Sequence, residues 1–405
     1  MRKRSRSMKE KRPRSIKDWI QQGTYDLSFF LVVMALLTFG LVMLYSASYV
    51  SAGHSAKSNY DPAFYFKKQL EFAVIGVIVM LLVSRVKVIL LKKFAYVFAA
   101  FYVVLLVVVL FMPSKDGSKA EFHRWLDLPL LPKFQPSELA KFGLILFCSR
   151  VMASRKKIAE TFGGYDLAIP ICLMMTVLTC GLVVAEKHLS CTILLLGMGC
   201  VMLILGGIRT RWIVIVGVCT LVGLAILLIW YEQIIPKLPL KGYMKERLMA
   251  WLSKSDDLAR DERWQTNQSL YAIGSGGLFG QGLGRSKQKH LYMPEPQNDF
   301  IFSIVCEELG FVGAVTILLL FALLIWRGFV IAMNSDKRFN ALLVMGIITQ
   351  VGLQTVLNVL VVTDTFPNTG ISLPFFSSGG SSLLVLLGEM GIVLSVSRAS
   401  NLQKK

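Results

Sequence analysis

Ten runs of apolar residues dominate this sequence, and each is near the roughly 20 residues that a membrane-spanning helix requires. Only 17% of the 405 residues are charged, whereas about 25% is usual for a soluble domain. The pattern therefore predicts an all-α fold, namely a polytopic integral membrane protein with ten transmembrane helices. The predicted spans are residues 27–45, 72–86, 94–112, 137–151, 167–184, 190–208, 212–231, 299–326, 341–362 and 381–396.

Basic residues gather between the apolar runs. Nine of the 44 Lys and Arg residues lie in a basic tail over residues 1–26. With that tail in the cytoplasm, 25 basic residues fall inside and 19 outside, ten of them in one long extracytoplasmic loop between helices 7 and 8, residues 232–298. Because cytoplasmic loops are enriched in Lys and Arg, we expect both termini to be cytoplasmic. The membrane domain then covers residues 27–398, and residues 399–405 form a short second tail.

The net charge of +19 does not indicate nucleic-acid binding, because the Lys and Arg residues cluster between the apolar runs. This is how a membrane protein marks its cytoplasmic loops. We expect the basic tail to orient the chain and to adhere to anionic membrane lipids, with a partner-binding tail as the alternative. The first apolar run has no clear cleavage site after it, so a retained helix is expected. All seven cysteines lie in apolar runs, and the four histidines lie on separate segments. Neither set predicts a disulfide framework or a metal site.

Asp299 is the first candidate for chemistry, because it lies where the long outer loop meets the eighth span. Asp is a common helix N-cap, and a general base at the membrane boundary is the functional alternative. Glu307 and Glu308 follow, about 12 Å further along a helix. Acids at that depth are either paired within a bundle or functional, and we favour structural pairing.

A second candidate is the segment QPSELAK, residues 135–141. Glu138 and Lys141 are three residues apart, so they share one face of a helix. One interpretation is a local ion pair with Lys141 extending outward, and the other is that Lys141 meets an anionic headgroup while Glu138 orients it. Upstream, Arg124 lies between His123 and Trp125, and this basic and aromatic group is a weaker headgroup candidate.

Two loops are unusual in composition. Residues 366–383 are rich in Pro, Gly and Ser and carry no charge, which favours a loop that re-enters the bundle over a plain tight connection. The glycine-rich residues 274–284 lack a dinucleotide fingerprint, so they are expected to form a tight loop or to let the backbone approach a ligand or a helix. Before them, residues 245–258 predict a short interfacial helix with Leu248, Trp251 and Leu252 on one face.

The segments HRW with QPSELAK, YMPEPQNDFIFSIVCEELG and PNTGISLPFFSSGGSSL, in this order, resemble the SEDS family (shape, elongation, division and sporulation), the FtsW/RodA-type proteins. The resemblance covers nearly the whole chain and is closer to the division and sporulation branch. It implies a peptidoglycan glycosyltransferase in the bacterial plasma membrane that polymerises lipid II with a class B penicillin-binding transpeptidase and other divisome or sporulation proteins. It also implies that Asp299 is the essential carboxylate and that Glu138 and Lys141 line the central cavity. Residues 187–192 and Asp364 depart from the family pattern.

The implied reaction is attack by the 4-hydroxyl of an acceptor GlcNAc on the anomeric carbon of a donor MurNAc, with undecaprenyl pyrophosphate leaving. Such chemistry needs a base near the hydroxyl and positive charge near the pyrophosphate. Asp299 is the candidate base, and Lys141 and Arg124 are the candidate cations. The protein builds in no cofactor, and a divalent cation (Mg²⁺ or Mn²⁺) held with the pyrophosphate is an open addition. A lipid II flippase or other lipid transporter, and a scaffold that only recruits the transpeptidase, are the alternatives.

Overall fold

The computed structural model describes residues 21, 23–112, 125–126, 134–161, 166–208, 211, 251–252 and 260–400. Within these residues the regular structure is helical, and the only strand-like feature is an isolated antiparallel bridge between Leu126 and Phe134. The all-α prediction is therefore confirmed for this part of the chain.

Nine of the ten predicted spans coincide with helices, and the seventh, residues 212–231, lies outside the described residues. Six helices are long and apolar enough to cross a membrane, namely α1, α3, α6, α11, α12 and α13. The chain is therefore a multi-pass membrane protein, while the total of ten spans stays a prediction. The nine helices are α1 (Leu27–Gly53), α2 (Phe64–Val83), α3 (Ile89–Leu110), α4 (Pro136–Ala153), α6 (Ala168–Ala185), α7 (Leu189–Leu205), α11 (Ile301–Met333), α12 (Arg338–Val362) and α13 (Gly380–Ala399).

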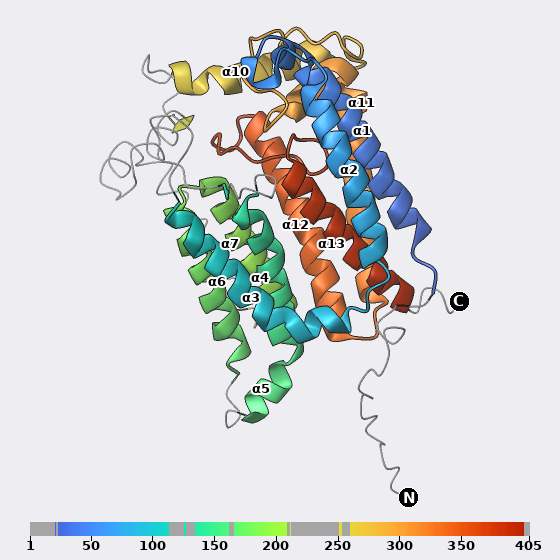
Figure 1. Ribbon diagram of the computed structural model, residues 1–405, viewed down its shortest axis with the longest axis vertical. Coiled ribbons are helices and arrows are strands. Elements are labelled where there is room, and N and C mark those ends of the chain that lie inside the picture. The colour runs from blue at the N-terminus through green and yellow to red at the C-terminus, as the bar shows by residue number, and fades with distance from the viewer. Residues whose placement is uncertain are drawn as a thin grey trace, which may run out of the picture.

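The helices form two groups that meet at α12 (Figure 1). In one group α1 and α2 pack with α11 and α13, and in the other α3, α4, α6 and α7 pack together. Helix α12 contacts α11 and α13 on one side and α4 and α7 on the other. Two buried apolar clusters form the core. One, with Phe321 and Phe376, is centred on the first group and extends across α12 into α4 and α7, and the other, with Tyr102 and Leu144, lies mainly in the second group. The boundary between the groups is where polar side chains collect, as described below.

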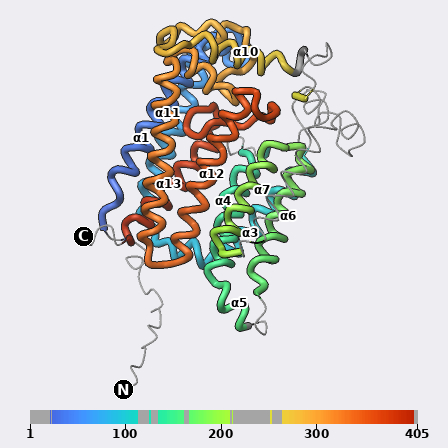
Figure 2. Tube along the Cα trace, turned by 180° about the vertical axis from the view of Figure 1, so that it is seen from behind, coloured from blue at the N-terminus to red at the C-terminus, as the bar shows by residue number. Residues whose placement is uncertain are grey.

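Three short helices were not predicted. They are η2 (Ala56–Ser58), α5 (Arg155–Thr161) and α10 (Arg260–Gly276). Helix α10 lies across one end of the bundle and packs on α11 and α12, as both views show (Figures 1 and 2). Of the predicted interfacial helix at 245–258, Trp251 and Leu252 are helical and half-buried, and the rest lies outside the described residues.

Helix α11 is interrupted at Gly310, whose φ of 68° and ψ of −169° are not helical. The glycine-rich segment fills the break. The N–H groups of Gln281 and Gly282 donate to the carbonyls of Glu307 and Glu308 at 2.9 and 3.0 Å. A Cβ on Gly280 would lie 2.2 Å from the Glu308 carbonyl oxygen, so only glycine permits this approach. The expectation that these glycines let the backbone approach a neighbouring helix is confirmed.

The start of α1 and the end of α13 lie at the same end of the bundle, opposite α10 (Figures 1 and 2). Asp26 caps α1 by accepting from the Phe29 N–H at 2.9 Å, and its N–H donates to Ser397 of α13 at 3.0 Å. Its carboxylate also pairs with Arg327 of α11 at 2.8 Å. Asp26 therefore ties α1, α11 and α13 together at this end.

Candidate functional site

The start of α4 places the Glu138 and Lys141 pair inside the protein. Pro136 occupies the first turn, where its missing N–H costs nothing, and Glu138 follows in the same turn at the positive end of the helix. The Lys141 Nζ lies 2.8 Å from the Glu138 carboxylate, and only 3% of the lysine side chain is exposed. The ion pair that we considered is therefore present. Lys141 does not extend outward, and it projects toward the boundary between the helix groups.

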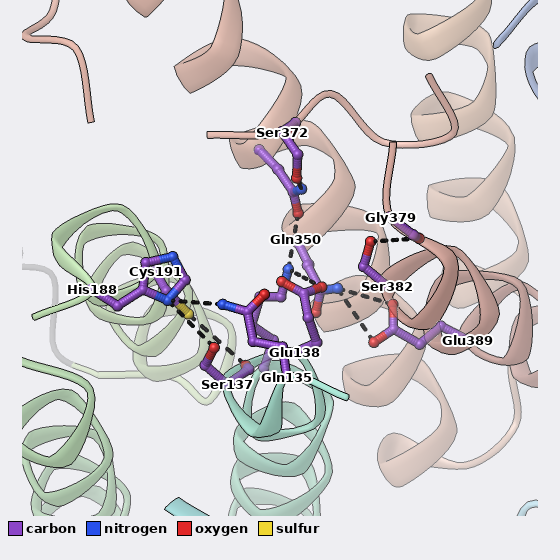
Figure 3. Close-up of polar contacts among 12 residues, drawn as sticks. Gln135, Ser137, Glu138, His188, Cys191, Gln350, Ser372, Gly379, Ser382 and Glu389 are labelled. Atoms are coloured by element: carbon purple, nitrogen blue, oxygen red, sulfur yellow. Dashed lines mark hydrogen bonds and ion pairs between the residues drawn. The ribbon is translucent and has the colours of Figure 1, made fainter. Parts of the chain in front are cut away.

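Lys141 also connects α4 to the charge-free loop at residues 366–379. Its Nζ donates to the Gln354 Oε1 at 3.2 Å, and the Gln354 Nε2 donates to the Ser372 carbonyl at 2.9 Å. About one turn away on α12, the Gln350 Nε2 donates to the buried Glu389 carboxylate of α13 at 3.0 Å. Lys141, Gln350, Gln354 and Ser372 line a small recess between α4, α12, α13 and the loop. Figure 3 shows the polar side chains around it.

The opposite side of this cluster is the start of α7 (Figure 3). His188, the N-cap residue of α7, lies with its Nδ1 3.2 Å from the Gln135 Nε2 and 3.4 Å from the Ser137 Oγ. The Cys191 thiol donates to the Ser137 carbonyl at 3.9 Å. His188 and Cys191 belong to the 187–192 segment, so this segment contacts the same helix start as the ion pair.

Asp299 is not a helix cap. Helix α11 begins at Ile301 and its N-cap residue is Phe300, so the interpretation of Asp299 as the N-cap residue is wrong. The carboxylate lies instead over Gly370, where an added Cβ would be 2.9 Å from the Asp299 Oδ2. Gly370 has a φ of 73°, which favours glycine, so the loop approaches the carboxylate through backbone alone. The Ser190 Oγ lies 4.0 Å from the same Cβ position.

Asn358 of α12 holds the backbone of Asp299 in place. Its Nδ2 donates to the backbone carbonyl of Asp299 at 2.8 Å and to that of Ile371 at 2.6 Å, and the side chain is fully buried. One amide group therefore joins the segment that carries the candidate base to the charge-free loop. Sequence reasoning missed this residue and Gln350 and Gln354. Their spacing of four places them on one face of an apolar helix, and that pattern could have identified them.

The loop at residues 366–379 enters the bundle as predicted and is not a plain connection. Phe375 and Phe376 are buried, and the Phe375 carbonyl packs so closely on Gly40 of α1 that a Cβ there would lie 2.3 Å away. On the other side, the Ser377 Oγ donates to the Asn298 carbonyl at 2.6 Å. The loop thus lies between Asp299 on one side and Lys141 on the other.

Glu307 and Glu308 are paired structural acids, as we favoured. Both precede the break at Gly310, in the short first segment of α11. Glu308 pairs with Lys289 at 2.8 Å and accepts from the Ser46 Oγ at 2.7 Å. Glu307 accepts from the Ser286 Oγ at 2.5 Å.

Asp364 has a structural contact in this fold. Its carboxylate pairs with Arg263 of α10 at 3.1 Å, and its carbonyl accepts from the Trp251 Nε1 at 3.2 Å. The residue therefore joins the end of α12 to α10.

Arg124 and His123 lie outside the described residues, so the role of Arg124 stays a prediction. Across the described ranges, no group of three His, Cys, Asp or Glu residues is placed to hold a metal ion.

Comparison with known proteins shows which family the chain belongs to. The sequence model of the cell cycle protein family of FtsW, RodA and SpoVE matches residues 26–402. The chain belongs to this family. Stage V sporulation protein E of Bacillus subtilis (strain 168) is 36% identical over 93% of the chain and 97% of its own length. A probable peptidoglycan glycosyltransferase FtsW of Trichlorobacter lovleyi is 35% identical, over 92% of the chain and 93% of its own length.

Solved structures of the family share the fold. A chain from a peptidoglycan synthase complex, described as coordinating polymerization and crosslinking, aligns with a TM-score of 0.70 at 28% identity, over 92% of this chain and 98% of that one. The rod shape determining protein RodA of Thermus thermophilus aligns with a TM-score of 0.63 at 29% identity, over 92% of this chain and 97% of its own. The resemblance to the SEDS family is therefore confirmed, including its division and sporulation branch.

Proposed function

We propose that this member of the family is a peptidoglycan glycosyltransferase that polymerises lipid II into glycan strands on the outer face of the plasma membrane, during cell division or sporulation. The relatives named as glycosyltransferases support the activity. The observation that carries the assignment of residues is the position of the charge-free loop. The loop lies against Asp299 at Gly370, and its Ser372 is connected to Lys141 through Gln354. A candidate base and a candidate cation thus flank one loop.

In this mechanism Asp299 is the general base. Its carboxylate takes the proton of the acceptor GlcNAc 4-hydroxyl as that oxygen attacks the anomeric carbon of the donor MurNAc. The bond from this carbon to the pyrophosphate breaks, undecaprenyl pyrophosphate leaves, and an α-linked donor gives a β-1,4 bond by inversion. Such a base typically contributes about 10²–10⁴-fold to the rate.

Lys141 is the candidate for stabilising the leaving pyrophosphate, with Arg124 as a second cation. The Lys141 ammonium is paired with Glu138 and Gln354, which fix its position in a mostly buried site. A positive charge in such a site acts more strongly on developing negative charge than it would in water. Any Mg²⁺ or Mn²⁺ ion would depend on the pyrophosphate oxygens for most of its ligands, because the described residues contain no cluster of its own.

The proposal includes an orientation and partners. Both termini are cytoplasmic, and the end that carries α10 faces outward. Cysteine labelling at position 255 from outside intact cells tests this orientation, and labelling only after lysis would reverse it.

A class B penicillin-binding transpeptidase is the proposed partner, together with other divisome or sporulation proteins. The solved relative from a peptidoglycan synthase complex supports a transpeptidase partner.

Reconstitution separates the enzyme from a lipid II flippase or a scaffold. The full chain and its transpeptidase are incorporated into liposomes with labelled lipid II, and both glycan chains and transbilayer movement of lipid II are measured. Glycan chains from the parent protein support the enzyme. Movement of lipid II without polymerisation would favour the transporter, and the absence of both would favour the scaffold.

A further inference from the structure

Glu389 is a buried acid in the middle of a membrane span, and it has no part in the chemistry proposed for Asp299 and Lys141. It is the tenth of the 20 residues of α13, one of the six helices able to cross a membrane, and only 2% of it is exposed. Acids at such a position are costly and are usually functional. We propose that Glu389 holds a proton in the resting protein, and that this proton allows Lys141 to bind the anionic pyrophosphate of lipid II. The identity of this ligand rests on the proposed function.

The hydrogen bonds of Glu389 are the first argument. Gln350 of α12 donates from one nitrogen, Nε2, to both carboxyl oxygens at 3.0 and 3.3 Å, and both side chains are buried (Figure 3). The Gln350 Oε1 is buried as well, and within the described residues no group donates to it. An ionised carboxylate only accepts hydrogen bonds, whereas a protonated carboxyl group also donates one. A proton on Glu389 would therefore supply a donor for the neighbouring Gln350 Oε1.

The charges near Glu389 are the second argument. Among the described residues, its carboxyl group interacts electrostatically with one cation, Lys141, and with one further acid, Glu138. Lys141 is already paired with Glu138 at 2.8 Å. An ionised Glu389 would leave this buried cluster with one negative charge in excess, which is costly away from water. A proton on Glu389 makes the cluster neutral.

The other charged residues on α13 and on the helices packed against it lie near helix ends or in separate pairs. Those on α2 are exposed in its first two turns, and the acids of α11 precede the break at Gly310, where Glu308 pairs with Lys289. The rest are arginines toward the far end of the bundle, one of them paired with Asp26. These residues are Lys67, Lys68 and Glu71 on α2, Arg150 on α4, Glu307, Glu308 and Arg327 on α11, Arg338 on α12 and Arg398 on α13.

The proton determines how strongly Lys141 attracts an anion. With Glu389 protonated, Lys141 has a single counter-charge in this cluster, Glu138, and it borders the recess between α4, α12, α13 and the loop. With Glu389 ionised, a second negative charge lies near the ammonium group and repels the pyrophosphate. We therefore expect lipid II to bind more weakly as the pH rises and Glu389 loses its proton. By linkage, bound lipid II should hold that proton more tightly.

The experiment observes Glu389 both directly and through its ligand. Infrared difference spectra of the full-length parent and of Glu389→Gln are compared near neutral pH, and the affinity for labelled lipid II is measured in nanodiscs from mildly acidic to alkaline pH. The parent should show the carbonyl band of a protonated carboxyl group that the variant lacks. The parent should also bind lipid II about tenfold more weakly at alkaline pH, which is a typical coupling between two sites. The variant resembles the protonated residue and should bind tightly throughout.

Glu71→Gln is the matched control, because it removes an exposed carboxylate from α2 and should keep the pH response of the parent. Equal pH responses of the parent and Glu389→Gln, or absence of the carbonyl band from the parent, would overturn the inference even if the parent polymerises lipid II. A parent that binds lipid II with the expected pH response without polymerising it would refute the proposed activity alone. If Glu389→Gln does not fold, Glu389→Leu/Gln350→Leu replaces the pair with apolar side chains and should also lose the pH response.

Discussion

The side-chain amide of Asn358 donates to the backbone carbonyl of Asp299 at 2.8 Å. The same nitrogen donates to the carbonyl of Ile371 at 2.6 Å, so the candidate base and the charge-free loop are held by one buried group. Asn358 lies on α12, whose neighbours include both helix groups. The position of Asp299 therefore depends on a residue that has no need to touch the substrate.

Asn358→Leu should lower kcat for glycan polymerisation more than it raises KM for lipid II. The change removes the Asn358 hydrogen bonds to the carbonyls of Asp299 and Ile371, at a cost of about 1–3 kcal/mol for the buried one, and frees the Asp299 backbone to move. A misplaced catalytic group can cost about 10²-fold in rate. In an Asp299→Asn background, the same change should have little further effect on the rate. The matched control is Thr355→Val, which removes a buried hydrogen bond within α12 that does not reach Asp299.

Gly370→Ala should reduce polymerisation by about 10²-fold with a small loss of thermal stability. The new methyl group would lie 2.9 Å from the Asp299 Oδ2, and φ at this position is 73°, which disfavours any Cβ. Purified protein is assayed with labelled lipid II and its melting temperature is measured. Gly181→Ala is the control, because no atom lies within 4 Å of its added Cβ. Parent-like activity of Gly370→Ala would mean that Asp299 does not act from this position.

Lys141→Ala should weaken the use of lipid II more than folding. Loss of one charge-assisted contact to the pyrophosphate should cost about 1.5–3 kcal/mol, which is measured as the drop in kcat/KM. The change also leaves Glu138 without its partner, so Glu138→Gln/Lys141→Ala is compared with it to separate the two effects. If expression and activity fall together in the single variant and recover together in the double variant, the pair is structural only.

The buried pair of Glu308 and Lys289 should stabilise the contact of the loop before α11 with the first segment of that helix, without taking part in the chemistry. Lys289→Met leaves a buried, unpaired carboxylate and should cost about 3–5 kcal/mol of unfolding free energy. Lys289→Met/Glu308→Leu should recover most of this loss, because apolar packing often replaces a buried pair. Thermal unfolding of the two variants checks this. Lower activity in a double variant that melts like the parent would instead indicate a direct role in catalysis.

The spans and candidate residues were largely predictable, because apolar runs and intramembrane charges are strong local signals. The ion pair of Glu138 with Lys141 and the re-entry of the 366–383 loop were predicted separately, and their connection through Gln354 was not. The break at Gly310 was not predictable from α11 alone, since its backbone partners come from residues 277–282. The N-cap was assigned wrongly to Asp299 because contacts with distant segments do not show in a local sequence pattern. A start-of-helix pattern does not reveal that a loop some 70 residues later approaches the carboxylate.

Asp299→Asn tests the central claim most directly. Asn is nearly isosteric and keeps the backbone bond to Asn358, but it does not accept a proton near neutral pH. We predict that the variant folds, binds its transpeptidase and retains lipid II, while its rate of glycan polymerisation falls by about 10²–10⁴-fold. Asp299→Glu should also be poor, because the added methylene displaces the carboxylate. Polymerisation by Asp299→Asn at near the parent rate would contradict the account and move the base to another carboxylate, such as Glu138.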